Sequence, residues 1–401
     1  MMKVLKTTLA VALALSANVA FADENVENQA SSIKDAVTNG DVLLNFRYRL
    51  EDVDQDNPLE DALASTLRSR LTFKTKEVNN FSAVFEADDV TYLFEDDEHN
   101  SLRNGITSHS VVADPEGTEI NQFAVSYTGF DKTKITVGRQ RVNLGNQRFV
   151  GGVAWRQNEQ TYDAVTIANT SIANTQIVYG YVSNVNNILG DNMDTDTHLL
   201  DYRWTGSDDF NVSAYGYFLD LADAPAASTR TLGLRFNNGK KSDFLWALEY
   251  AKQADYADNA KDLSASYYLA EVGYKFDGWK AMFGHEVLTG EAGNPGHSFQ
   301  TPLATKHKFQ GWADLFLGTP DAGIEDTYIS VNTAWSGFKF GAAYHDFKAE
   351  DGNADYGSEI DFVISKKISD EYSVALKFAD YSADQHAVDT RKVWLTFTAN
   401  Y

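Results

Sequence analysis

The last nine residues, VWLTFTANY from Val393 to Tyr401, decide the fold class because their side chains alternate without a break. One face of this segment carries Val393, Leu395, Phe397, Ala399 and Tyr401. The opposite face carries Trp394, Thr396, Thr398 and Asn400. A period of two residues predicts a β-strand with one apolar and one polar face. We therefore expect the chain to end on an amphipathic strand.

The same alternation recurs along most of the sequence. Val42, Leu44, Phe46, Tyr48 and Leu50 alternate with Leu43, Asn45, Arg47 and Arg49. Comparable runs lie at residues 67–73, 81–85, 123–127, 135–137, 200–204, 232–236, 244–250, 268–276, 338–344, 360–364 and 372–378. Turns rich in Gly, Asn and Asp separate them. About 18 or 19 candidate strands occur, and because single-chain bacterial barrels usually have even numbers, we predict 18.

The start of the chain predicts export. Lys3 and Lys6 precede an apolar stretch at residues 9–15, and Ala20-Phe21-Ala22 provides small residues around a cleavage site. This pattern is typical of a secretory signal peptide. We therefore expect residues 1–22 to be removed near Ala22 and residues 23–40 to form a short periplasmic segment with at most one helical turn.

Composition narrows the class of protein. The 401 residues include no Cys and only 6 Pro, and aromatic residues make up 13%. Without Cys, a small disulfide-stapled secreted fold is excluded. No downstream segment offers the roughly 20 consecutive apolar residues of a transmembrane helix. The mean hydropathy of −0.36 still suits a membrane barrel, because only alternate strand residues must face lipid.

These features together predict an all-β, transmembrane antiparallel β-barrel over residues 41–401, in a single domain. The terminal strand with its aromatic last residue resembles the closing strand of bacterial outer-membrane barrels. Amphipathic strands in hydrocarbon must close into a ring, because every backbone N–H and C=O needs an internal partner. A soluble exported β-sandwich is the alternative that uses similar strands. We expect localisation in the outer membrane of a Gram-negative bacterium.

The formal net charge is −23, and acidic residues crowd into expected loops, for example residues 95–98, 191–196 and 350–351. We interpret these acidic segments as a solvated outer surface that divalent cations could bridge to lipopolysaccharide. The expected lumen face differs, because its early positions are Arg47, Arg49, Arg68, Arg70 and Lys74. Further inward candidates of both signs are Arg203, Arg235, Lys275, Lys377, Lys392, Glu86, Asp88, Asp201, Glu249, Glu271, Glu286 and Asp361.

Two interpretations of the lumen charges remain open. The two signs could form ion pairs that fill and stiffen the barrel. Alternatively, the arginine-rich first strands could bind carboxylates, since the planar guanidinium suits bidentate recognition. Rings of Arg or Lys also line pores for anions.

The densest polar block runs from Gly138-Arg139-Gln140-Arg141 through Gly145-Asn146-Gln147-Arg148 to Trp155-Arg156-Gln157 and Gln160 to Ala164. This block resembles the alginate export family of outer-membrane porins. Residues 44–51 and 64–75 are similar to the opening of that family. The likeness is strongest over roughly the first 170 residues.

The resemblance implies an 18-stranded monomeric barrel whose arginine-rich constriction passes an anionic uronate polymer. It assigns substrate-binding, pore-lining roles to Arg47, Arg49, Arg68, Arg70, Arg139, Arg141, Arg148 and Arg156. Arg139 shares the parity of apolar Ile135 and Val137, so its inward placement requires a bulge or a position beyond the lipid belt.

Two other functions fit an outer-membrane barrel. A less selective diffusion porin for small sugars or organic acids would use the inward charges as wall structure. An outer-membrane hydrolase would need a Ser or Asp oriented by His, and His297-Ser298 and His345-Asp346 are the nearest candidates. We expect no catalytic residues, metal, cofactor or nucleic-acid partner. The expected partners are outer-membrane lipid, lipopolysaccharide, an anionic solute, and the barrel-assembly machinery through the strand ending at Tyr401.

Overall fold

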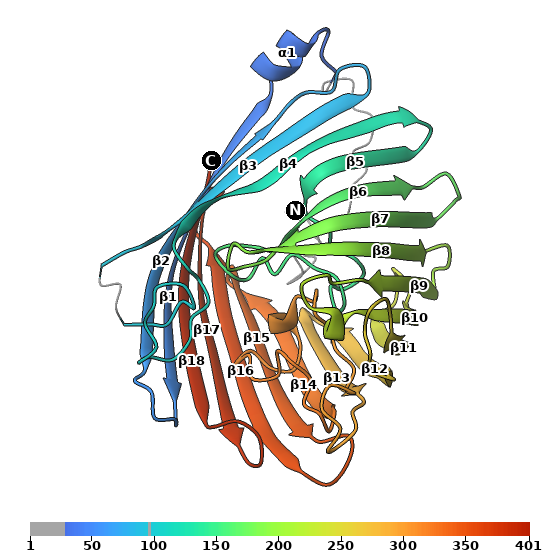
Figure 1. Cartoon of the computed structure of the whole chain (residues 1–401). Helices are drawn as coiled ribbons and strands as arrows, with labels where there is room; N and C mark the ends of the chain where they lie inside the picture. Colours follow the sequence, from blue (N-terminus) through green and yellow to red (C-terminus); the bar gives the residue numbers. More distant parts are fainter. Residues whose placement is uncertain (1–28, 95–97) are drawn as a thin grey trace, which may run out of the picture.

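The computed structural model describes residues 29–94 and 98–401. The predicted signal peptide and part of the acidic segment 95–98 therefore lie outside the described residues. Within the described part, 18 strands form one antiparallel sheet that closes into a barrel (Figure 1). The predicted all-β barrel with 18 strands is confirmed. No helix in the described part is long and apolar enough to span a membrane.

Each strand pairs with its neighbours in sequence, and β1 also pairs with β18. The strands are β1 (Asp41–Gln55), β2 (Ala62–Lys74), β3 (Phe81–Tyr92), β4 (Gly117–Phe130), β5 (Thr133–Gln140), β6 (Thr161–Asn169), β7 (Thr175–Asn186), β8 (Asn192–Trp204), β9 (Phe210–Leu219), β10 (Thr229–Asn238), β11 (Phe244–Asp255), β12 (Ser264–Phe276), β13 (Trp279–Leu288), β14 (Ile324–Trp335), β15 (Phe338–Lys348), β16 (Asp355–Lys367), β17 (Tyr372–Ala383) and β18 (Thr390–Asn400). The helices are α1 (Ile33–Thr38), η2 (Pro225–Ala227) and η3 (Lys306–Lys308).

The two ends of the barrel sequence close the ring. The Leu44 N–H donates to the Tyr401 carbonyl at 2.9 Å, and the Tyr401 N–H donates to the Leu44 carbonyl at 2.8 Å. From there β1 and β18 pair in continuous register, from Asn45 opposite Asn400 to Gln55 opposite Thr390. The terminal aromatic residue therefore belongs to the seam that leaves no open sheet edge.

The expected alternation places apolar side chains on the outer face. Leu232, Leu248, Phe283 and Ile360 are each at least half exposed on the isolated barrel, which is the arrangement required where the surrounding solvent is lipid. The opposite parity faces the lumen and contains most buried charged residues, for example Glu286 at 3% exposure.

The connections are unequal at the two ends of the barrel. At the end that holds α1 and the carboxyl terminus, connections such as 131–132, 277–278 and 336–337 are very short. At the other end, three long connections occur: L2 (residues 93–116), L3 (141–160) and L7 (289–323). Outer-membrane barrels have short periplasmic turns and longer extracellular loops, so this asymmetry favours the prediction that the segment with α1 is periplasmic.

L3 and L7 fold back into the barrel and supply its core (Figure 1). Phe149 of L3 lies 5.3 Å from the Tyr267 ring centroid and 5.9 Å from that of Phe299 in L7. Val150 and Leu303 form a β-bridge between the two loops. Phe299 and Leu303 are completely buried, so the two loops pack as one apolar unit inside a polar wall.

Candidate functional site

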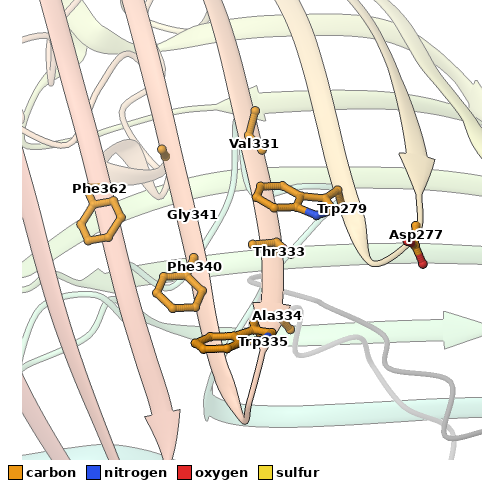
Figure 2. Close-up of a pocket in the computed structure, with 10 residues that line it drawn as sticks. Asp277, Trp279, Val331, Thr333, Ala334, Trp335, Phe340, Gly341 and Phe362 are labelled. Atoms are coloured by element: carbon orange, nitrogen blue, oxygen red, sulfur yellow. The ribbon is translucent and has the colours of Figure 1, made fainter.

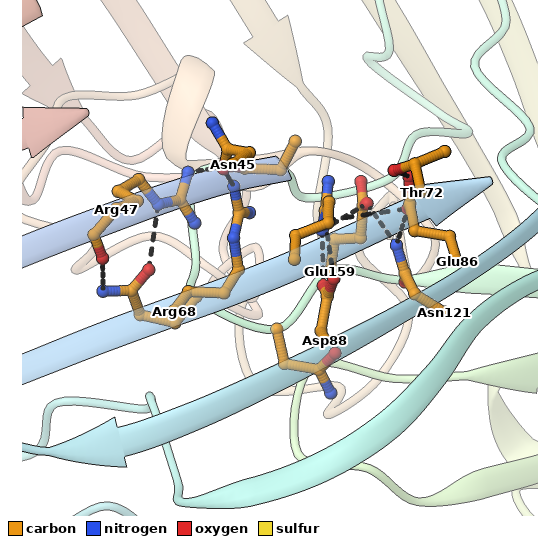
Figure 3. A network of polar contacts seen from close by, with 12 residues as sticks. Asn45, Arg47, Arg68, Thr72, Glu86, Asp88, Asn121 and Glu159 are labelled. Atoms are coloured by element: carbon orange, nitrogen blue, oxygen red, sulfur yellow. Dashed lines mark hydrogen bonds and ion pairs between the residues drawn. The ribbon is translucent and has the colours of Figure 1, made fainter. Parts of the chain in front are cut away.

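An ion-pair network fastens L3 to the barrel wall (Figure 3). Arg70 on β2 lies 2.5 Å from Asp88 on β3 and 2.7 Å from Glu159 of L3. Arg141, the first residue of L3, donates to Glu159 at 2.8 Å and also pairs with Glu86. The structure therefore brings the predicted site residues Arg70 and Arg141 together, but around carboxylates of the protein itself.

Glu159 is the centre of this network and is 1% exposed. Burial opposes its ionised form, but the charges of Arg141 and Arg70 outweigh burial and hold the pKa well below its usual range. Asn121 adds a hydrogen bond to the carboxylate at 2.6 Å. Glu159 is therefore a charged anchor, since an ionised buried carboxylate is stable only when it is paired and hydrogen-bonded.

Arg47 and Arg68 differ from Arg70 because their acceptors are neutral oxygens (Figure 3). Arg47 Nε donates to the Gln157 side chain at 2.9 Å, and its Nη1 donates to the Ala154 carbonyl at 2.9 Å. Arg68 Nη2 donates to Asn45 Oδ1 at 2.5 Å. Among the described residues, neither guanidinium has a carboxylate within 4 Å, so their charges are the least compensated of the predicted set.

Arg156 joins both inward loops to the wall. Its Nη1 lies 3.1 Å from Glu51 on β1, and its Nη2 lies 3.2 Å from Asp314 of L7. Burial lowers the pKa of Arg156, but Glu51, Asp114 and Asp314 outweigh this effect and raise it. Arg156 thus remains charged and couples L3 to L7.

Arg49 and Arg148 are also buried. The Arg49 guanidinium lies 4.1 Å from the centre of the Trp155 ring and 3.7 Å from Asp114. Arg148 donates to Glu286 on β13 at 2.8 Å, far along the barrel wall from the strands that carry Arg47 and Arg68. The structure therefore separates Arg148 from the other inward arginines.

The predicted lumen placement is wrong for Arg139. Ile135, Val137 and Arg139 pair in unbroken register with Ile167, Val165 and Asp163 on β6, without a bulge in β5. With a period of two, Arg139 must share the outer face of Val137, which is 51% exposed. Its Nε donates to Asp163 at 2.8 Å. Arg139 therefore belongs to a polar patch with Asp163 and Asn192 at the end of the barrel that carries the long loops.

L7 is fastened to the wall through His307. Its Nδ1 lies 2.8 Å from Asp314, its Nε2 lies 2.5 Å from Lys377 Nζ on β17, and its ring stacks on Trp155 at 4.1 Å. Lys377 can only donate, so His307 accepts at Nε2 and donates from Nδ1 to Asp314. Burial lowers the pKa of His307 to about 3, although Asp314 acts in the opposite direction.

Two basic residues of L7 were not among the predicted site residues. Lys306 and Lys308 flank His307 in η3, and Lys308 Nζ donates to the Asn146 carbonyl at 3.0 Å. Burial lowers the pKa of Lys306, and Arg148 adds to this effect. In the sequence, these residues could have been recognised as a Lys-His-Lys triplet in a long loop whose other charged residues are the acids Glu291, Asp314 and Asp321.

A groove of about 550 Å³ lies on the lipid-facing surface (Figure 2). Trp279, Val331, Phe340 and Phe362 point into it from β13 to β16, with Trp335 at its edge beside the turn between β14 and β15. These residues have the outward parity of their strands. The groove is therefore open to the membrane and is separate from the lumen.

The hydrolase candidates do not form a nucleophile–base pair. Ser298 Oγ donates to the Thr319 carbonyl at 3.2 Å. His345 Nδ1 lies 2.9 Å from Asp326 in the lumen wall. In residues 29–94 and 98–401, no group of three or more His, Asp or Glu could hold a metal ion.

The closed ring, its apolar outer band and its polar interior define an outer-membrane channel. The family model for alginate export matches residues 41–292, which is more than half of the chain. The chain belongs to the alginate export family, so the suspected resemblance is confirmed. The family consists of channels and not enzymes, and the barrel resides in the outer membrane of a Gram-negative bacterium.

Solved structures support the same architecture. Acinetobacter baumannii OccAB4 has a TM-score of 0.68 at 15% identity, covering 90% of this chain and 97% of that protein. Pseudomonas aeruginosa OpdK with vanillate has a TM-score of 0.71 at 11% identity, covering 91% and 99%. Pseudomonas aeruginosa OpdQ has a TM-score of 0.69 at 12% identity, covering 90% and 99%. No curated protein shows significant similarity to the sequence.

Proposed function

We propose that this outer-membrane channel passes anionic solutes by passive diffusion, with uronate oligosaccharides or polysaccharides such as alginate as the first candidates. Membership of the alginate export family supports a carboxylate substrate. The vanillate named with OpdK is also a carboxylate, although that protein shares only 11% identity. Binding in such a path must be weak and repeated, because a tightly held solute would not leave.

The observation that carries the proposal is the state of Arg47 and Arg68. Both face the lumen, and the hydrogen bonds that their side chains donate go to neutral oxygens instead of carboxylates, while Arg68 Nε is buried without a hydrogen-bond partner among the described residues. Arg47 is partly exposed. A passing carboxylate could therefore exchange for Gln157 or a loop carbonyl without disrupting an ion pair, and charge-assisted hydrogen bonds are the stronger ones.

The remaining inward arginines have a different proposed role. Arg70, Arg141 and Arg156 share carboxylates with L3 and L7, and Arg148 pairs with Glu286. We infer that these four fix the inward loops and thereby shape the path. Arg49 is buried under Trp155. It would therefore act on solutes only through the electric field of its charge and not by direct contact.

The second candidate is the less selective diffusion porin. The ion pairs of the inward arginines favour it, because paired charges contribute wall structure and little net field. It predicts that changes at Arg47 and Arg68 leave ion selectivity unchanged.

The test is single-channel recording of the refolded protein in a planar bilayer under a KCl gradient. Arg47→Gln together with Arg68→Gln keeps hydrogen-bonding capacity and removes two charges without stranding a carboxylate. The proposal expects an anion-selective reversal potential for the unchanged protein, block by tetragalacturonate, and weaker block in the double variant. Arg103→Gln, on an exposed extracellular residue paired with Asp191, is the matched control. Cation-selective or unselective conductance without block would refute the proposal.

Lipid surrounds the barrel in the outer membrane. We propose two further partners on the basis of chemistry alone: lipopolysaccharide at the acidic extracellular loops through divalent cations, and the assembly machinery at the strand that ends with Tyr401.

A further inference from the structure

Six basic residues occupy the periplasmic ends of the strands. Each is the last, the next-to-last or the second residue of its strand at that end: Lys74 of β2, Lys134 of β5, Arg203 of β8, Lys275 of β12, Lys280 of β13 and Lys339 of β15. We call this set the periplasmic basic ring. It is distinct from the Arg47–Arg68 pair, which contacts L3.

The register directs these side chains inward. Lys134 lies opposite Ala168, which is 3% exposed, and has the parity of buried Gln140. Lys339 has the parity of Gly341, whose partner Val363 is 8% exposed. The other four residues follow the same rule, since each has the parity of buried wall residues on its own strand.

Aromatic residues fix the depth of the ring. Five members are direct sequence neighbours of an aromatic residue that faces outward: Phe73-Lys74, Arg203-Trp204, Lys275-Phe276, Trp279-Lys280 and Phe338-Lys339. Aromatic girdles mark the membrane interface of outer-membrane barrels. The basic residues therefore lie at one level, at the periplasmic mouth of the lumen and at the height of the girdle.

No member of the ring has an ion pair within 4 Å among the described residues. Glu271 attracts Lys280, Glu77 attracts Lys134, and Asp201 attracts Arg203 from a longer distance. Most of the nearby acids have closer contacts of their own. Asp41 pairs with Lys76 at 2.9 Å, Glu271 pairs with Arg235 at 3.3 Å, and Glu77 accepts hydrogen bonds from neighbouring polar side chains.

Like charges meet directly within the ring. Lys275 and Lys280 are Cα partners on adjacent strands, and Lys74 repels Lys134. Like charges placed directly opposite each other destabilise a sheet. Four members, namely Lys74, Arg203, Lys275 and Lys339, are exposed to solvent. Such an arrangement is stabilised by any multivalent anion that enters the mouth.

We propose that the periplasmic basic ring is an anion-binding site that sets the charge selectivity of the channel and captures carboxylate-bearing chains at its periplasmic mouth. The inference rests on the proposed function and deepens it by assigning selectivity to lysines at the mouth. Acidic side chains already neutralise most arginines at the constriction, whereas six unpaired cations focus an attractive field into the mouth.

The test compares the unchanged channel with the double variant Lys275→Gln, Lys280→Gln under a KCl gradient centred near 0.1 M. Neither side chain has an ion-pair or hydrogen-bond partner in the part of the chain that the structure describes, so the amides should leave folding intact. Lys366→Gln is the matched control, because Lys366 lies at the same level but faces outward, with Nζ 4.3 Å from the Phe338 ring. Tetragalacturonate added to one side at a time gives the second readout.

The proposal expects the chloride-to-potassium permeability ratio to fall by about threefold or more in the double variant, and the difference to shrink in 1 M KCl, where charges are screened within about 3 Å. Block from the periplasmic side should weaken, while block from the extracellular side stays unchanged. Lys366→Gln should match the unchanged channel.

The outcomes separate this inference from the proposed function. An anion-selective channel whose ratio is unaffected by the double variant would overturn the ring and leave the proposed function standing. A cation-selective channel whose ratio still falls threefold in the double variant would refute the proposed function and support the ring. Equal effects of the Lys275/Lys280 and Lys366 variants would overturn the ring, because orientation toward the lumen would then be irrelevant.

Discussion

Acid should open L7, because His307 is held neutral in the closed structure. Its Nε2 faces the Lys377 ammonium, so a second imidazole proton has no acceptor there. Burial lowers the pKa of His307 to about 3, whereas an imidazole released into water titrates near 6.5. The open loop therefore binds more protons than the closed loop between these values, and lowering the pH favours the open loop.

The size of the pH effect follows from the linkage between proton binding by His307 and opening of L7. Above about pH 6.5, keeping His307 unprotonated costs the closed state almost no free energy. This free-energy cost grows as the pH falls toward about 3. Between pH 7 and pH 5 the closed state should lose about 2 kcal/mol relative to the open state, a change of about 25-fold in their ratio. The groups that face His307 are Asp314, Lys377 and Arg156, and their contacts are included in its pKa.

Cysteine labelling can measure this opening, because the chain has no Cys. Ser298→Cys introduces a completely buried thiol on L7. Its modification rate by a charged methanethiosulfonate, divided by the rate for the urea-unfolded variant at the same pH, should rise about 25-fold from pH 7 to pH 5. Adding His307→Gln should abolish the rise, and adding His198→Gln on the outer face should not. A pH-dependent rise that survives His307→Gln would refute the reasoning.

Three further changes test the packing and the topology. Glu159→Gln should destabilise the closed position of L3 by about 3–5 kcal/mol, because it breaks a buried ion pair; proteolysis of L3 would report this, and the exposed Glu60→Gln should have no effect. Leu376→Arg should cost about 2–4 kcal/mol in urea titrations in lipid vesicles, because it faces lipid, whereas its lumen-facing neighbour Ala375→Arg should cost much less; equal costs would contradict the register. Phe299→Ala should weaken L7 packing by about 3–5 kcal/mol, and unchanged labelling at position 298 would argue against the shared L3–L7 core.

The strands were predictable because a period of two is written directly into the sequence. The run from Val42 to Leu50 predicts which residues face lipid, and the same parity predicts that Arg47 and Arg68 face the lumen; in the structure Arg47 contacts Gln157 of L3. The parity rule also warned against Arg139, where the resemblance suggested otherwise. The rule was therefore more reliable for orientation than the motif.

The constriction was not predictable from the strands. L3 and L7 have no period that fixes their path, and their positions depend on contacts between distant residues, such as Arg156 with Asp314 and Val150 with Leu303. Half of the periplasmic basic ring was likewise not among the inward-facing residues that the sequence predicted. Lys134, Lys280 and Lys339 each lie at the second position of a strand, and their significance appears only when strand ends are aligned around the barrel.

Burial explains why the two groups of basic residues differ in their pairing. Where L3 and L7 cover the wall, a guanidinium loses its hydration and needs other partners. Arg70, Arg148 and Arg156 obtain carboxylates as the loops pack, whereas Arg47 obtains neutral oxygens. At the periplasmic mouth Lys74, Arg203, Lys275 and Lys339 are exposed to solvent, so their charges can remain unpaired. A paired, buried cation exerts little net field on a passing ion, whereas an unpaired cation at the mouth exerts its field within a Debye length of about 10 Å at 0.1 M salt. Electrostatics therefore favours the mouth over the constriction as the determinant of charge selectivity.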